Sequence, residues 1–216
     1  MKKRLLSKAL WLAWQQEHLG QYYISCNRSV MNQRKITVNL IWANVFGVIL
    51  FLAVTILSCS TWYFMWGYPT LDDFRVNSFL GHNAFLAALF ILMLFIMGAI
   101  VHELIHGITW ACFATNKFRS IHYGIIWEVL TPYCHCDEQL TVRQYSIGAL
   151  MPLFVLGVIP LVVAFPFKSI PLLVWGIMFV SAAAGDILIV WKLRKEPSAC
   201  LVLDHPKEAG CIIFEE

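Results

Sequence analysis

The sequence predicts an all-α membrane protein with four transmembrane helices and a cytoplasmic loop that can contain a short β-hairpin. Two observations predict this class. First, 59% of the 216 residues are hydrophobic and only 13% are charged, whereas a soluble domain carries about 25% charged residues. Second, the apolar residues form long uncharged runs, and about 18 such residues suffice to cross a bilayer as a helix. We therefore expect residues 1–216 to form a single polytopic membrane domain.

Four runs are long enough to cross a membrane, at about 37–67, 84–113, 147–167 and 170–191. The first two exceed the minimum length, so their helices have room to tilt. Pro166 and Pro171 bracket a very short turn between the last two, which makes those helices antiparallel neighbours. The leader, 1–36, suits either an interfacial helix or an ordinary juxtamembrane segment. The tail covers 192–216.

The connection 114–146 is the largest polar segment between two spans. It contains a β-prone run at 122–127, which is the origin of the predicted hairpin, and residues 211–214 of the tail are also strand-like. We expect both segments to lie outside the membrane, on the same side.

The positively charged residues indicate the orientation of the chain. Lys and Arg are concentrated in the leader, in the 114–146 connection and in the tail, whereas the other two connections carry only Arg75 and Lys168. Because cytoplasmic segments are enriched in Lys and Arg, and the number of spans is even, we expect a multi-pass cell-membrane protein with both termini in the cytoplasm. The net charge of +3 gives no reason to expect a nucleic acid partner, since the basic residues flank segments that contact the lipid bilayer.

Only four ionisable side chains fall inside the predicted spans: His102, Glu103, His106 and Asp186. Such groups are costly in lipid and therefore mark functional sites. Residues 102–106 form an HExxH motif, which on a helix lets both imidazoles reach one metal ion. Glu103 flanks that face, where it can accept a proton from the attacking water. A catalytic zinc usually takes three protein ligands, so a third is expected from elsewhere.

Asp186 is the best candidate for the third ligand because of its depth. His102 lies ~18 residues into its span and Asp186 ~16 residues into its own, which corresponds to ~27 Å and ~24 Å along helices that run in the same direction. Small residues at 98–99 and 181–185 allow these helices to approach closely. The sequence therefore predicts zinc ligands at His102, His106 and Asp186, with Glu103 as the catalytic base.

Several alternatives stay open. Asp186 could instead pair with Lys192 or Arg194 at the interface. The 114–146 connection offers other third ligands, namely His122, Glu128, His135, Asp137 and Glu138. The Cys134-His135-Cys136 run could hold a second metal, although its only possible complements downstream are the scattered Cys200 and Cys211. Candidate oxyanion donors are Tyr123, Tyr133, His135 and Tyr145.

The HELIHG motif, the Gly185-Asp186 pair and the TPYCHC run at 131–136 resemble a bacterial family of putative zincin peptidases, known mainly as a domain of unknown function. The resemblance covers nearly the whole chain, including the Asp204-His205-Pro206 segment. More distantly, the chain is similar to site-2-type intramembrane metalloproteases, although it lacks their Asn-x-x-Pro lead into the aspartate and a PDZ module. The resemblance implies His102, His106 and Asp186 as zinc ligands and Glu103 as the base.

We therefore expect a zinc-dependent endopeptidase that hydrolyses membrane or membrane-proximal proteins or peptides near the cytoplasmic face. The alternative is a zinc-binding membrane scaffold or regulator without proteolytic activity. Glu103 disfavours the scaffold mildly, because a purely structural zinc site has no use for a base beside its ligands.

The orientation is tested by labelling with a thiol reagent that cannot cross the membrane. In a background without the seven native cysteines, Asn77→Cys should react in intact cells and Asn116→Cys only after permeabilisation. The reverse pattern would invert the orientation.

Overall fold

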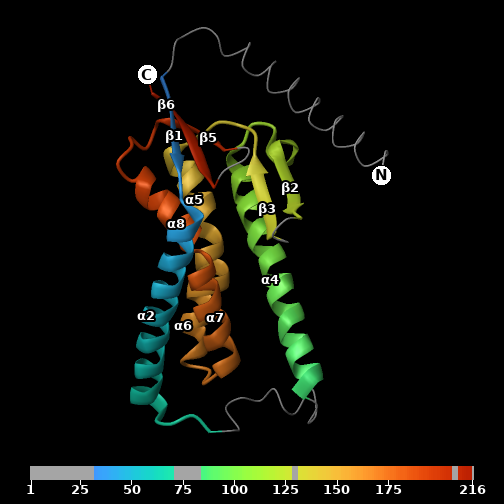
Figure 1. Cartoon of the computed structure of the whole chain (residues 1–216), viewed down its shortest axis with the longest axis vertical. Coiled ribbons are helices and arrows are strands. Elements are labelled where there is room, and N and C mark those ends of the chain that lie inside the picture. Colours follow the sequence, from blue (N-terminus) through green and yellow to red (C-terminus); the bar gives the residue numbers. More distant parts are fainter. Residues whose placement is uncertain (1–31, 71–83, 128–130, 206–208, 216) are drawn as a thin grey trace. The chain divides into compact units, whose positions relative to one another are not determined.

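The computed structural model describes residues 32–70, 84–127, 131–205 and 209–215. The greater part of the predicted leader and of the 68–83 connection, together with Glu128, lies outside the described residues. Arg34–Phe214 form one unit, and the statements below concern this unit. Figure 1 shows its long helices side by side, with short strands gathered at one end.

Three stretches of helix correspond closely to the first three predicted spans. They are α2 (Leu40–Trp66), α4 (Ala84–Phe113) and a continuous helical stretch, Val142–Ala164. The third consists of α5 (Val142–Pro152), a π-helical segment (Leu153–Val158) and α6 (Ile159–Ala164). It begins earlier than the predicted residue 147 because Thr141 and Gln144 form a capping box that starts the helix at Val142.

The last apolar run, predicted as one helix over 170–191, is a bent pair instead. Its two parts, α7 (Ile170–Ala182) and α8 (Ala184–Leu193), meet at an angle of 45°. The backbone of Ala183, with ψ of 10°, leaves the helical conformation between them. Within the described residues, three helices are long and apolar enough to cross a membrane, or four if the bent pair counts as one span.

The predicted hairpin is present, and the structure adds a sheet that the all-α class omits. Strands β2 (Ile121–Ile126) and β3 (Thr131–Cys136) pair in antiparallel fashion after a short 3₁₀ turn (Lys117–Ser120), and β3 packs against α4. A separate sheet has the order β1-β6-β5-β4. Its strands are β1 (Asn32–Thr37), β4 (Leu140–Thr141), β5 (Leu201–Asp204) and β6 (Gly210–Glu215).

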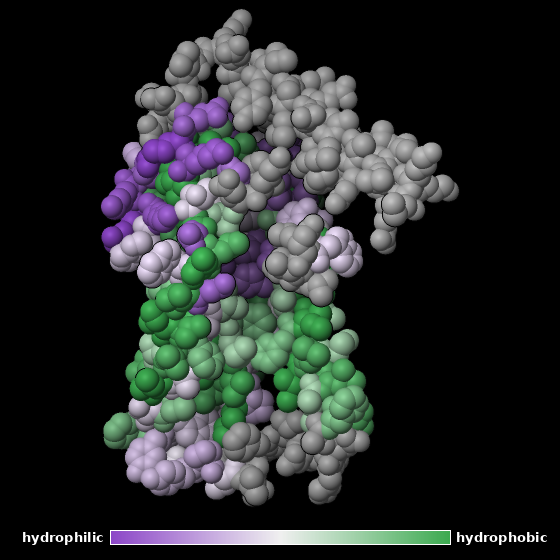
Figure 2. Space-filling view, viewed as in Figure 1, coloured by the Kyte–Doolittle hydropathy of each residue, from purple (hydrophilic) through white to green (hydrophobic). Residues whose placement is uncertain are grey.

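Apolar side chains lie both in the core of the unit and on its surface. A core between the strands and the helix ends contains Trp110, Leu193, Val202 and Ile213. Along α2, in contrast, the most apolar 18-residue window has no buried residue. Figure 2 shows the resulting apolar band across the helices, with hydrophilic residues above it. An exposed apolar surface of this extent suits contact with lipid.

Candidate metal centre

Two histidines on α4 form the first half of the site. His102 and His106 lie one helical turn apart, and their rings meet edge to face with centroids 4.8 Å apart. Both are buried, with 9% and 5% of their surface exposed. Buried imidazoles need polar partners, so other polar groups are expected to face them.

Asp186 supplies the second half, from the first turn of α8. Its Oδ2 lies 3.2 Å from His102 Nε2 and its Oδ1 lies 3.6 Å from His106 Nε2. The bend at Ala183 starts a new helix just before Asp186, and the N-terminus of a helix favours a carboxylate in its first turn. The structure thus brings together the three side chains that the sequence analysis predicted as ligands.

The three side chains have the chemistry and spacing of a zinc site. Their donor atoms all lie within 4.8 Å of one another. Zinc binds histidine nitrogen and carboxylate oxygen at about 2.0–2.2 Å in tetrahedral geometry, which separates neighbouring ligand atoms by ~3.3 Å. The two histidine–aspartate separations of 3.2 Å and 3.6 Å bracket that value, and the donor atoms of the two histidines lie within 4.8 Å of each other. Two nitrogens and one carboxylate could therefore hold a zinc ion and leave a fourth position for water.

The other nitrogen of His106 is held by α5. Its Nδ1 lies 2.9 Å from the carbonyl oxygen of Gly148, so the ring donates there and keeps Nε2 directed at Asp186. Histidine ligands of metals usually have such a partner, which fixes the ring and its tautomer. A Cβ at position 148 would collide with the Trp110 indole. Glycine is thus what lets the α5 backbone come close enough for this hydrogen bond.

A stack of rings continues from His106 away from the metal centre. The imidazole stacks on Trp110, and Trp110 stacks on Tyr145, each with centroids 5.2 Å apart. The Tyr145 hydroxyl then donates to Asp204 Oδ1 on β5 at 2.9 Å. Residues 106, 110, 145 and 204 share no local motif that would join them, so this support could not be predicted from the sequence.

Glu103 lies beside the three-residue group without belonging to it. It is half-buried, and its carboxylate accepts a hydrogen bond from the backbone N–H of Cys134 on β3. The glutamate is therefore held between α4 and the hairpin. This is a suitable position for a base that acts on a water at the neighbouring metal site.

Tyr123 reaches the same side of α4 from β2. It is the cross-strand partner of Cys134, and its hydroxyl occupies the space that a Cβ at Gly107 would need. Gly107 lies one helical turn beyond Glu103, on the same face. Burial, together with the nearby Cys134 and Glu103, raises the pKa of the Tyr123 hydroxyl, which keeps it protonated. Tyr123 thus places a hydrogen-bond donor next to the predicted base.

The other candidate oxyanion donors point elsewhere. Tyr133 lies against Gly124, and alternation along β3 puts its side chain on the face opposite Cys134. His135 shares that opposite face and binds Asp204, with Nδ1 and Oδ2 3.0 Å apart. Tyr145 is buried and bound to Asp204. Of the four candidates, Tyr123 is the one beside Glu103.

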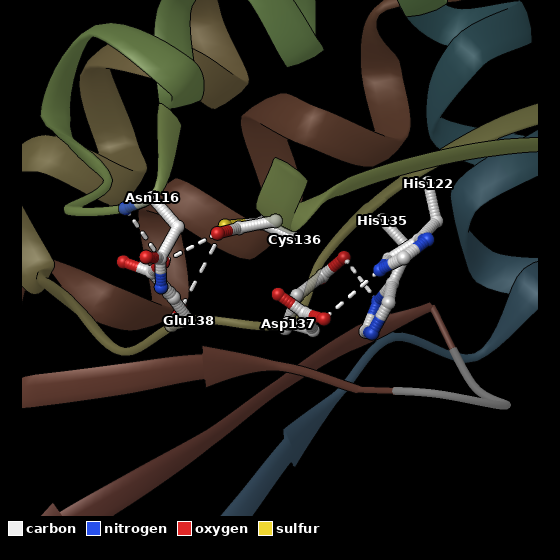
Figure 3. Close-up of polar contacts among 8 residues, drawn as sticks. Asn116, His122, His135, Cys136, Asp137 and Glu138 are labelled. Atoms are coloured by element: carbon white, nitrogen blue, oxygen red, sulfur yellow. Dashed lines mark hydrogen bonds and ion pairs between the residues drawn. The ribbon is translucent and has the colours of Figure 1, made fainter. Parts of the chain in front are cut away.

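The rival third ligands from the connection have other partners. His122 pairs with Asp137, with Nε2 and Oδ2 2.9 Å apart, and both side chains are 45% exposed. Figure 3 shows His122 and His135 next to Asp137, with Cys136, Glu138 and Asn116 grouped apart. Among the described residues, only His102, His106 and Asp186 form a group that could hold a metal.

Glu138 has a structural position just beyond the end of α4. Its carboxylate accepts hydrogen bonds from the backbone N–H groups of Thr115 and Asn116 and from the side chains of Asn116 and Ser120. Burial raises the pKa of Glu138, but these hydrogen bonds outweigh it and lower the pKa below its usual value. Because Asn116 is engaged here, Phe118, which is 62% exposed, is the better position for the labelling experiment.

The Cys134-His135-Cys136 run does not form a second site in the described residues. Successive side chains of a strand point to opposite faces. Cys134 and Cys136 face α4 together with their partners Tyr123 and Ile121, whereas His135 points away from it. The three side chains therefore do not converge on one ion.

The contact between Gly148 and His106 leads to a prediction. Gly148→Ala should push α5 away from Trp110 and break the hydrogen bond to Nδ1, because the new Cβ has no room. Loss of such a partner typically lowers metal affinity by about 10–100-fold, which competition with a chelator would measure. Gly47→Ala on α2 is the control, since its Cβ would make ordinary contacts at 3.5 Å. Equal zinc affinity in both variants would contradict the role of Gly148.

A family described as "Putative zincin peptidase" matches residues 83–201, which include the HExxH motif and Asp186. This is more than half of the 216 residues. No curated protein and no solved structure matches the chain. The chain therefore belongs to the family of putative zincin peptidases.

Proposed function

We propose that the protein is a zinc-dependent, membrane-embedded endopeptidase that cleaves membrane or membrane-proximal substrates near the cytoplasmic face. The observation that carries this proposal is the convergence of His102, His106 and Asp186 beside Glu103, on helices whose outer surface is apolar. Family membership supports a zinc metallopeptidase. The membrane setting is supported by the three or four helices able to span a bilayer.

Each residue then has a defined part in hydrolysis. His102, His106 and Asp186 would hold the zinc, which, when bound, polarises the scissile carbonyl and makes a water more acidic. Glu103 accepts the proton of the attacking water and passes it to the leaving amine. The backbone N–H of Cys134 contributes a hydrogen bond to the Glu103 carboxylate. A site that only stored zinc would have no use for this arrangement.

Tyr123 is suited to stabilise the transition state. Its protonated hydroxyl lies on the face of α4 that carries Glu103, where it would face the carbonyl oxygen of a substrate attacked at the metal centre. Donors at such positions are typically worth a factor of about 10²–10³ in kcat. We assign Tyr123 this role in the proposed reaction.

The substrate must be unwound where it is cut. In a helix, each peptide group is occupied by an internal hydrogen bond, and within lipid no water replaces that bond. The metal centre lies towards the end of α4 that meets the hairpin, and the positive charges of the sequence favour the cytoplasm for that end. Cleavage near this boundary resembles that of site-2-type proteases.

The site assignment is tested by zinc content. Purified wild-type protein should hold about one zinc ion. His102→Ala, His106→Ala and Asp186→Ala should lose it, because each removes a ligand. Asp186→Asn, which keeps the shape but not the charge, should retain more zinc than Asp186→Ala. The zinc content of each purified variant is measured by metal analysis, and full occupancy in a variant that combines His102→Ala with His106→Ala would refute the site.

Glu103→Gln separates the peptidase from the zinc-binding scaffold. It should keep zinc but lose hydrolysis of model transmembrane peptides in proteoliposomes, since the amide cannot accept the proton. A scaffold would keep its function in this variant. If Glu103→Gln hydrolysed the peptides at the wild-type rate, the proposed mechanism would be excluded.

Tyr123→Phe should lower kcat by about 10²–10³-fold while zinc content and KM stay near wild type. The control is Tyr133→Phe, which removes a hydroxyl from the opposite face of the same hairpin and should leave kcat unchanged. A similar loss in both variants would indicate a general effect on the hairpin instead.

A further inference from the structure

We propose that a basic pocket beside α8 binds the phosphate headgroup of an anionic phospholipid. The pocket has a volume of about 460 Å³ and lies outside the metal centre. Residues from both ends of the described chain line it, chiefly Arg34, Lys35, Trp191, Lys192, Arg194 and Lys195. The proposal depends on the chain lying in a bilayer and is independent of peptide hydrolysis.

The charge of the pocket favours an anion. Five of its side chains are cationic, and Glu196 is the one acidic residue that lines it. Glu196 pairs with Arg34, with Oε1 and Nη2 2.7 Å apart. In the described part of the chain, no ion pair involves Lys35 or Lys195, and both are exposed. A positive charge is therefore left over that a phosphate could neutralise.

The pocket is also built, rather than being a scatter of surface lysines. The Lys192 ammonium donates to the carbonyl of Thr37 at 2.6 Å, which ties α8 to the end of β1. The guanidinium carbon of Arg194 lies 3.5 Å from the centre of the Trp191 ring, a cation–π contact. The hydrogen bond from Lys192 to Thr37 joins residues 155 positions apart in the sequence. A mere excess of positive charge on one side of the membrane would not require residues of β1 and α8 to line the same pocket.

A lipid fits better than a free phosphate because exposed apolar residues lie next to the pocket. Helix α2 begins three residues after Thr37, and Leu40, Ile41 and Trp42 are 67%, 73% and 69% exposed. Trp191 is 58% exposed, and tryptophan prefers the membrane interface. Figure 2 shows a hydrophilic patch directly above the apolar band. A headgroup in the pocket could thus be continuous with acyl chains along α2, as in other basic headgroup sites between transmembrane helices.

The test titrates the detergent-solubilised protein with phosphatidylglycerol and counts bound lipids by native mass spectrometry. Wild type should retain one phosphatidylglycerol in preference to phosphatidylcholine. Lys35→Gln/Lys195→Gln should weaken that binding by on the order of tenfold, because two positive charges are lost near the phosphate. The control, Arg119→Gln/Arg143→Gln, removes two exposed charges that do not line the pocket and should bind as wild type.

Three results would overturn the proposal. Equal retention of phosphatidylcholine would show that the site does not select for a negatively charged headgroup. Displacement of the lipid by inorganic phosphate at a similar concentration would indicate a site for free anions. An equal loss in the control pair would indicate general electrostatic attraction. Zinc content measured in every variant confirms that the fold is intact, and hydrolysis is not needed as a readout.

Discussion

The cost of placing ionisable groups among apolar helices is the constraint on which this structure depends. An isolated carboxylate or imidazole in such surroundings is expensive. Here the carboxylate of Asp186 faces both Nε2 atoms of His102 and His106, so the three groups satisfy one another. The helices must therefore meet at that level, and the small residues and the break at Ala183 are what permit it.

The remainder of the unit holds these helices in place. Gly148 on α5 fixes the ring of His106, and the stack through Trp110 and Tyr145 extends to Asp204 on β5. The hairpin holds Glu103 through the Cys134 N–H. Residues far from the metal centre are thus coupled to it through rigid contacts, which accords with the high precision that metal and catalytic sites require.

The sequence predicted the parts of the site that follow from local periodicity. An HExxH motif on a helix places its two histidines on one face. The matching depth of His102 and Asp186 in their two spans was enough to predict that Asp186 lies beside the histidines. The β-prone run at 122–127 predicted the hairpin. The strand-like run at 211–214 lies in β6, but the four-stranded sheet was missed because its strands are short and two of its pairings, β1 with β6 and β4 with β5, join segments far apart in the chain. The contact of Gly148 with His106 could not be predicted, and Tyr123 could not be singled out among the four candidate donors, since both positions arise from packing between elements and not from spacing along one.

The strand order β1-β6-β5-β4 has a consequence for biosynthesis. The strand between β1 and β5 is β6, which the ribosome makes roughly 170 residues after β1, or about 10–30 s at 5–20 residues per second. Every apolar helix has been synthesised by then. Helices α2 and α4 can therefore form while β1 still lacks its neighbour β6, and the sheet that contains Asp204 is completed only after the last helix has been made. The support that runs from Asp204 through Tyr145 and Trp110 to His106 is thereby completed last.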